Sequence, residues 1–174
     1  FERYHENDHY RLMRAVEHFE ATGTKISIQK KIFDEILKPL FEDILSNSVE
    51  DDELSSLALS AGLSSEEIEL LRSYYNILWQ FDRSASRTSM RVCLSQHASS
   101  SAQLARLFKI KFDPAYAISK TDRENQGITL LEEFKDGLRN VKDITDDRIL
   151  RATATIIEQT VRTNFYQRKQ KGYH

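Results

Sequence analysis

The chain has 174 residues, which is enough for one domain or two small ones with a core of their own. Its 25 Lys and Arg residues nearly balance 27 Asp and Glu residues, and a net charge of −2 argues against a nucleic-acid-binding surface. No apolar stretch is long enough to span a bilayer, and the sole cysteine, Cys93, excludes an internal disulfide. We therefore expect a cytoplasmic protein that binds neither nucleic acid nor a membrane.

The N-terminal segment, residues 1–25, contains the pattern H-E-x-x-H at His5, Glu6 and His9. In zinc hydrolases this spacing places two histidine ligands on one helix face, with the glutamate beside the metal-bound water. Here the centre of the pattern holds Asn and Asp, which are poor helix formers. The other histidines form no recognisable third-ligand pattern. A zinc hydrolase, adventitious metal binding and a solvated turn are therefore the alternatives for this stretch.

From residue 26 to residue 174 the apolar spacing is helical, and the whole chain has only 5 Gly and 2 Pro to interrupt it. The sequence therefore predicts an all-α bundle of about seven to eight helices. In the helix expected over 27–45, Ser27 is a suitable N-cap. Pro39 lies inside the same run, where we expect a kink or a break.

Two helices are expected within residues 51–81. Gly62 ends the first, and Ser64 begins the second with Glu67 three residues later, the pattern of a capping box. The second helix has two apolar seams, which favours a central position. These seams are Ile68, Leu71, Tyr75 and Leu78, and Leu70, Tyr74, Ile77 and Phe81.

Further helices are predicted over 87–98 and 100–113, the second ending because a residue before proline avoids helical angles. A helix over 121–141 has the apolar stripe Ile128, Leu131, Phe134, Leu138 and Val141. The last helix is expected to have Thr145 as its N-cap and a buried face of Ile149, Leu150, Ile156, Ile157, Val161 and Phe165.

The short link between the last two helices predicts an antiparallel helical hairpin. We therefore divide the helical domain, residues 26–174, into a subdomain over 26–113 and a C-terminal hairpin over 114–170.

Cys93 and His97 lie four residues apart, a spacing that suits a nucleophile and its base on one helix. The apolar register that Cys93 shares with its neighbours favours a buried structural thiol instead. Trp79 has helical spacing, which favours packing over stacking on a base or a cofactor. The basic end of the chain is interpreted as a solvated helix end. The isolated glycines form no phosphate-binding loop, so no dinucleotide-binding residue is assigned.

Three stretches resemble, in order and spacing, segments of the large NAD-specific glutamate dehydrogenases. The third is the most specific, because helix packing does not require RTNFYQ. The stretches are EDDELSSLALSAGLSSEEIELLRSYYNILWQ at 50–80, ARLFKIKFDP at 105–114 and DDRILRATATIIEQTVRTNFYQ at 146–167.

The resemblance implies that this chain is the helical segment immediately before the catalytic domain of such an enzyme. Enzymes of that family oxidise L-glutamate to 2-oxoglutarate and ammonia with NAD, and they are very long, cytoplasmic and homo-oligomeric. Their catalytic lysine motif and dinucleotide-binding domain would lie after residue 174. We therefore assign no catalytic, cofactor-binding or metal residue here, and NAD is expected as a cofactor of the parent enzyme alone.

The leading interpretation is a non-catalytic scaffold or regulatory segment whose partner is the rest of its polypeptide, above all the catalytic domain. The alternatives are a free-standing helical protein-interaction domain and, at residues 5–9, the zinc hydrolase. Polar residues on or near the last helix are expected either to dock against the catalytic domain or to cap and pair locally. They are Arg148, Arg151, Arg162, Asn164 and Tyr166.

Overall fold

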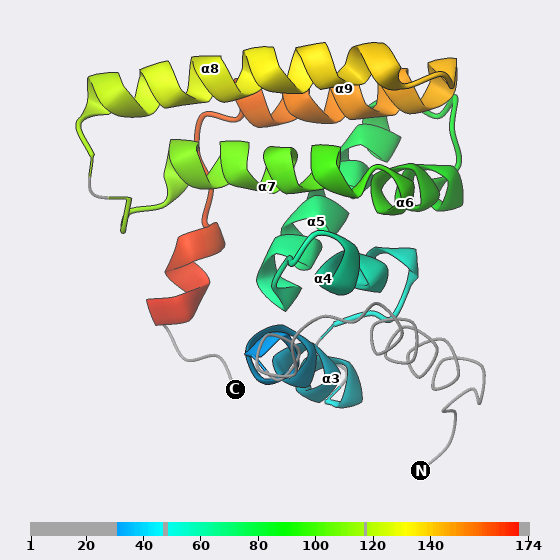
Figure 1. The fold of residues 1–174 in the computed structure, drawn as a ribbon, viewed down its shortest axis with the longest axis vertical. Coiled ribbons are helices and arrows are strands. Elements are labelled where there is room, and N and C mark those ends of the chain that lie inside the picture. The colour runs from blue at the N-terminus through cyan, green and yellow to red at the C-terminus, as the bar shows by residue number, and fades with distance from the viewer. Residues whose placement is uncertain (1–30, 47–48, 117, 171–174) are drawn as a thin grey trace. The chain divides into compact units, whose positions relative to one another are not determined.

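The computed structural model describes residues 31–46, 49–116 and 118–170 (Figure 1). Over these residues the chain is all-α, as predicted: it has seven α-helices, labelled α3 to α9, together with one π-helical turn and three 3-10-helical turns, and no strand. The chain divides into two compact units, one up to Glu69 and one from Leu70, and the division falls inside α5 (Ser65–Phe81). The expected boundaries at residues 25 and 113 stay predictions.

The described part of the first unit includes a π-helical turn, η1 (Phe33–Leu37), which continues directly into α3 (Lys38–Leu45). The N–H of Lys38 donates to the carbonyl of Phe33, the five-residue bond of a π-helix. Pro39 follows in the first turn of α3, a part of a helix in which proline is tolerated. The kink or break predicted at Pro39 is therefore a change of helix type, and the chain remains helical through it.

Two short helices, η2 (Glu53–Ser56) and α4 (Leu57–Ser60), lead to α5. Gly62 follows α4 with a φ of 66°, a left-handed conformation that stops the helix as predicted. The Ser64–Glu67 capping box is confirmed. The N–H of Ser64 donates to Oε2 of Glu67 at 2.9 Å, and the N–H of Glu67 donates to Oγ of Ser64 at 3.4 Å.

The predicted seams of α5 differ in burial. The first seam is buried throughout, with Leu71 at 0% and Leu78 at 4% exposure. The second seam is buried only in its first half, because Ile77 is 36% exposed and Phe81 is 82% exposed. The prediction of a helix that is apolar and covered on two sides is therefore wrong for the last turns of α5.

In the second unit, α7 (Ala98–Phe112) packs mainly against three other helices and lies alongside two of them, α8 and α9 (Figure 1). These neighbours are α6 (Arg87–Gln96), α8 (Lys120–Gly137) and α9 (Ile144–Gln159). As predicted, α7 ends before Pro114, because Asp113 has the extended ψ of 116° that a residue before proline prefers. The antiparallel hairpin of the last two helices stays a prediction, since the main contacts of both are with α7 or α6.

The buried stripe of α8 differs from the predicted one at its start. Leu130, Phe134 and Leu138 are 5%, 3% and 1% exposed, whereas Ile128, predicted in the stripe, is 58% exposed. Residues 130, 134 and 138 are spaced by four, so they lie along one ridge of the helical run formed by α8 and the 3-10-helical turn η3 (Leu138–Asn140). The apolar spacing identified the helix correctly, but the predicted stripe included the exposed Ile128 and left out the buried Leu130.

The ends of α9 also differ from prediction. Asp143, not Thr145, is the N-cap, because its Oδ1 accepts hydrogen bonds from the N–H groups of Thr145 and Asp146 at 2.7 and 3.0 Å. The helix ends at Gln159, so Val161, predicted on the buried face, lies beyond it and is 85% exposed.

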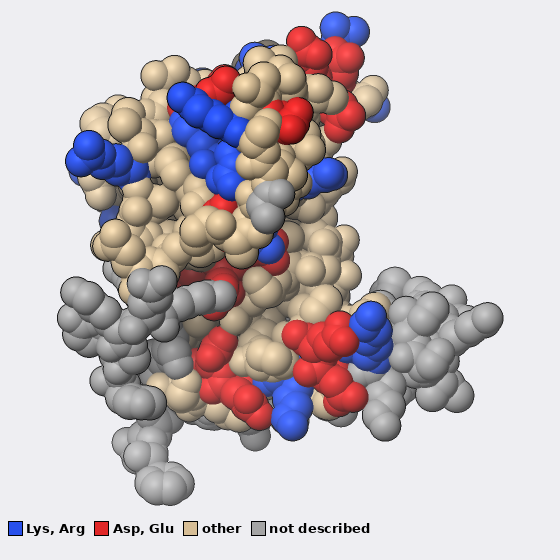
Figure 2. Space-filling view, turned by 90° about the vertical axis from the view of Figure 1, so that its left-hand side faces the viewer, with Lys and Arg blue, Asp and Glu red and all other residues tan. Residues whose placement is uncertain are grey.

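None of the helices among the described residues is both long enough and apolar enough to cross a membrane. Acidic and basic side chains lie next to one another on the face drawn in Figure 2, and neither sign covers that face alone.

Candidate functional site

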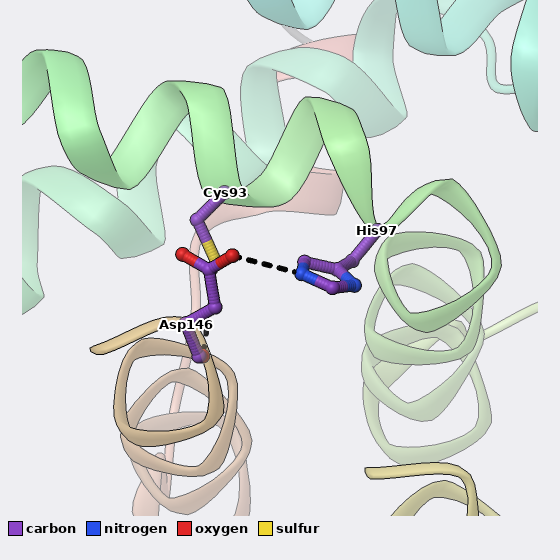
Figure 3. Close-up of side chains that lie close together, drawn as sticks. All are labelled: Cys93, His97 and Asp146. Carbon is purple, nitrogen blue, oxygen red and sulfur yellow. Dashed lines mark hydrogen bonds and ion pairs between the residues drawn. The ribbon is translucent and has the colours of Figure 1, made fainter. Parts of the chain in front are cut away.

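Three side chains that can bind a metal or move a proton meet where α6 contacts the first turn of α9 (Figure 3). Cys93 and His97 come from the last turn and the C-cap of α6, and Asp146 comes from the start of α9. Nε2 of His97 lies 3.0 Å from Oδ2 of Asp146. The thiol of Cys93 donates to the backbone carbonyl of Asp146, with Sγ 3.7 Å from the oxygen.

Burial and negative charge keep the thiol of Cys93 protonated. Its side chain is 1% exposed, and burial raises its pKa first, followed by the negative charges of Asp146 and Asp143. Backbone N–H groups at the start of α9 lower the pKa of Asp143, so that carboxylate stays charged at neutral pH. His97 bonds to Asp146 rather than to the thiol. This is the environment of an inert thiol, as the apolar register of Cys93 predicted, and not of a nucleophile.

The five polar residues expected near the end of the chain lie in three different environments. Nε of Arg151 bonds both carboxylate oxygens of Asp147 at 2.9 and 2.8 Å, and Nε of Arg148 lies 3.8 Å from Oδ2 of Asp82. Two of the others, Arg162 and Asn164, are exposed. The paired arginines fit the local alternative, and the exposed pair is available to a partner. Docking stays a prediction.

Tyr166, the fifth of these residues, packs into an aromatic cluster of the second unit. Its ring and that of Phe165 lie 6.1 and 5.3 Å from the ring of Phe108 in α7, centroid to centroid. Tyr74 of α5 and Phe112 complete the cluster at 5.9 and 4.9 Å from the same ring. The FY of RTNFYQ therefore anchors η4 (Phe165–Gln170) through packing.

Sequence reasoning did not find this cluster, because its members are up to 92 residues apart (from 74 to 166) and no local pattern links them. The hydroxyl of Tyr74 adds a polar link by donating to Oγ1 of Thr160 at 3.1 Å. That threonine is the C-cap of α9, so the bond fixes the point where the chain leaves the helix.

The second unit also contains a cavity of about 560 Å³ between α7 and α8, near the end of α9. Apolar side chains line most of it, including Ile110, Ile128 and Leu131. Two cations at its edge already serve the backbone. Lys111 bonds the carbonyls of Ile157 and Glu158, and Arg123 bonds those of Asp113 and Tyr116.

Trp79 was predicted to pack rather than to stack on a base or a cofactor. Trp79 is covered by the guanidinium groups of Arg83 and Arg87, whose Cζ atoms lie 3.8 and 4.0 Å from the ring centroid. Its faces are therefore not open to a base or a cofactor. The zinc-hydrolase pattern of His5, Glu6 and His9 lies outside the described residues, as does the predicted N-cap Ser27.

Two family models match this chain. One, described as "Glutamate dehydrogenase, helical motif 3", matches residues 49–114, and one described as "Bacterial NAD-glutamate dehydrogenase, catalytic domain" matches residues 133–174. The second match begins inside α8, so residues 133–174 of this chain already fall within the match to the catalytic-domain model. No solved structure matches.

Curated relatives agree with these models. The chain is 33% identical over 152 residues to the NAD-specific glutamate dehydrogenase of Pseudomonas aeruginosa, which covers 87% of this chain and 9% of that protein. It is 31% identical over 135 residues to the protein of the same name from Halomonas elongata, a match that covers 76% of this chain and 8% of that protein. It is 30% identical over 122 residues to the one from Mycobacterium tuberculosis, a match that covers 70% of this chain and 7% of that protein.

The chain thus spans less than a tenth of the length of each of these relatives, and the matched region includes most of its described helices. The order of the two family models along the chain, helical motif first and catalytic region second, agrees with the order of the three stretches in the sequence that resemble this family. This chain belongs to the family of NAD-specific glutamate dehydrogenases.

Proposed function

We propose that this segment is a non-catalytic scaffold that holds the start of the catalytic region of an NAD-dependent glutamate dehydrogenase. The parent enzyme would convert L-glutamate and NAD to 2-oxoglutarate, ammonia and NADH in the cytoplasm. The regulatory role of the segment would be indirect, through the position in which it holds that region. No residue of the segment would touch NAD or glutamate.

The observation that carries this proposal is the shared core around Phe108. That ring is 1% exposed and lies in α7, within the stretch matched by the helical-motif model. The rings of Phe165 and Tyr166, which pack against it, lie within the stretch matched by the catalytic-domain model. Because one core joins the two stretches, strain or loosening in the helical motif would be transmitted to the start of the catalytic region.

The test is Phe108→Ala in a full-length enzyme that contains this segment, with Ile128→Ala, at a 58% exposed position, as the matched control. Removing a buried Phe ring costs about 3–5 kcal/mol. We expect a lower thermal midpoint and less active enzyme, with unchanged KM values for NAD and L-glutamate in the fraction that stays folded. An unchanged midpoint would contradict the scaffold role.

A second measurement separates a scaffold from a ligand-binding module. The thermal midpoint of the 174-residue chain is measured with and without NAD, NADH, L-glutamate and 2-oxoglutarate. A ligand at 100 times its Kd that binds only the folded state adds about 2.7 kcal/mol, a shift of several degrees at this size. We expect no shift with any of the four, and a shift with NAD or L-glutamate would overturn the non-catalytic assignment.

A further inference from the structure

The cluster of Cys93, His97 and Asp146 combines three chemically different metal ligands at one point. Its Sγ, imidazole nitrogen and carboxylate oxygen all lie within 4.8 Å of one another. The side chains come from two helices whose contact fixes their approach. Thiolate, imidazole and carboxylate together are a ligand set that zinc accepts, whereas calcium and magnesium prefer oxygen alone. From this geometry we propose that Cys93, His97 and Asp146 form a zinc-binding site that joins the end of α6 to the start of α9.

The three ligand atoms lie near the separations of a zinc site. Zinc bonds sulfur at about 2.3 Å and imidazole nitrogen at about 2.0 Å, so tetrahedral ligands stand roughly 3.3–3.8 Å apart. Nε2 of His97 and Oδ2 of Asp146 are 3.0 Å apart, so they must separate by about 0.3 Å to admit a metal between them. Their side chains are 26% and 21% exposed, which gives the metal a path from solvent and leaves room for a water molecule as the fourth ligand. The three ligand atoms lie within 4.8 Å of one another, so sharing one zinc requires them to draw together by up to roughly 1–1.5 Å.

The charges around the cluster favour a cation. The carboxylate oxygen of Asp146 lies within 4.8 Å of both the sulfur of Cys93 and the imidazole nitrogen of His97, so it places a negative charge beside the other two ligands. A thiol that coordinates zinc loses its proton. On binding, the proton of Cys93 leaves to solvent, and His97 takes the tautomer that carries its proton on Nδ1, so that Nε2, which bonds Asp146 in the metal-free chain, offers its lone pair to the metal. Asp146 binds through the carboxylate oxygen that now faces His97. One proton is released for each zinc bound.

Such a site would clamp the two parts of the chain that the family models separate. Cys93 and His97 lie within residues 49–114, and Asp146 lies within residues 133–174. A metal here would therefore add a second link beside the aromatic cluster, at the opposite end of α9 from Thr160. This inference stands independently of the scaffold proposal, because metal binding is measured without enzyme activity.

Cobalt(II) tests the site directly, because Cys93 is the sole cysteine of the chain. Thiolate-bound Co²⁺ has a charge-transfer absorption band in the near ultraviolet that nitrogen and oxygen ligands do not produce. We titrate the reduced 174-residue chain, without an affinity tag, with Co²⁺ and then with Zn²⁺. We expect one equivalent of Co²⁺ to produce this band, Zn²⁺ to abolish it, and zinc to raise the thermal midpoint.

Three variants locate the metal. Cys93→Ser removes the band, and His97→Ala, which keeps the thiol, weakens Co²⁺ binding at least tenfold. The control His5→Ala/His9→Ala keeps both band and affinity, which separates this site from the H-E-x-x-H pattern. Absence of the band in the wild-type chain overturns the proposal, as does a band that survives in His97→Ala at unchanged affinity. Metal binding that is lost only in His5→Ala/His9→Ala also overturns it and assigns the metal to the N-terminal segment.

Discussion

At the scale of single residues, the environment of each polar group decides what the sequence pattern means. Cys93 and His97 have the spacing of a nucleophile and its base, yet the imidazole bonds Asp146, which is 49 residues away in the sequence. The pair was visible in the sequence, but the third member was not, because it depends on how α6 and α9 pack. Burial then turns a reactive pattern into an inert thiol.

This environment predicts slow chemical modification of Cys93 in the metal-free chain. An alkylating reagent at pH 8 should react with the native thiol orders of magnitude more slowly than with the thiol in denaturant, because only the exposed thiolate reacts. The rate should follow the opening of the structure and increase with added urea. Mass spectrometry reads the outcome unambiguously, since the chain has one thiol. Fast labelling of the native chain would show that the thiol is accessible.

Asp143 makes a prediction about pH. Hydrogen bonds from the N–H groups of Asp146 and Thr145 hold its pKa below the ordinary value of 3.8. A carboxylate with a lowered pKa in the folded state contributes its stability above the unfolded pKa and loses it as pH falls through the folded pKa. The charge of Asp143 should therefore stabilise the chain fully above about pH 4 and progressively less in more acidic solution.

Two substitutions separate the charge of Asp143 from its hydrogen bonds. Asp143→Asn keeps an acceptor at the N-cap, whereas Asp143→Ala removes it. At pH 7 the thermal midpoint should be highest for the wild type, lower for Asp143→Asn and lowest for Asp143→Ala. The difference in midpoint between the wild type and Asp143→Asn should become smaller as the solution is acidified. If Ala and wild type melt together at pH 7, the helix does not depend on this cap.

At the scale of helices, local chemistry was predictable and the choice of buried face was not. The Ser64–Glu67 capping box, the stop at Gly62 and the end of α7 before Pro114 each depend on a few adjacent residues, and all three are confirmed. Ile128 and Val161 were assigned to buried faces because they are apolar, and both are exposed. Periodicity shows that a helix has an apolar face, but only its neighbours determine how much of that face is covered.

Glycine substitutions test the helix ends with a matched pair. Gly62 has a φ of 66°, so Gly62→Ala should cost about 1–2 kcal/mol of backbone strain even though the new Cβ has space, 4.0 Å from Cδ1 of Ile36. Gly137 has a helical φ of −58° and no atom within 4 Å of an added Cβ. Gly137→Ala should therefore stabilise by roughly 0.5–1 kcal/mol.

Thermal midpoints of the two variants should move in opposite directions, by about 2–4 °C for each kcal/mol in a chain of this size. Equal shifts of the same sign would mean that the conformation at residue 62 does not control where α4 ends.

At the scale of the whole molecule, the compact units do not follow the family models. The helical-motif model covers residues 49–114 and so crosses the division between Glu69 and Leu70. The second unit contains both the end of that motif and the described part of the catalytic match. Sequence resemblance identified the family, but the shared core around Phe108 required the structure, because its rings are distant in the chain.

The exposed residues after α9 give the prediction that distinguishes docking from local pairing. Arg162 and Asn164 are exposed, whereas Arg151 is already paired with Asp147. If the first two contact the catalytic domain, Arg162→Ala should leave the thermal midpoint of the 174-residue chain unchanged. In a full-length glutamate dehydrogenase, the same change should lower both the midpoint and kcat, because a charged contact across the interface is lost.

The control is Arg139→Ala, since that side chain is 79% exposed and pairs only locally with Asp136 at 3.0 Å among the contacts of the described residues. A surface pair of this kind contributes about 0–1 kcal/mol, so the control should change little in either protein. If Arg162→Ala lowers the midpoint of the 174-residue chain as much as that of the full-length enzyme, the residue acts within this segment. Full activity and stability in the full-length enzyme would exclude docking through Arg162, whereas a loss confined to that enzyme would assign Arg162 to the interface with the catalytic domain.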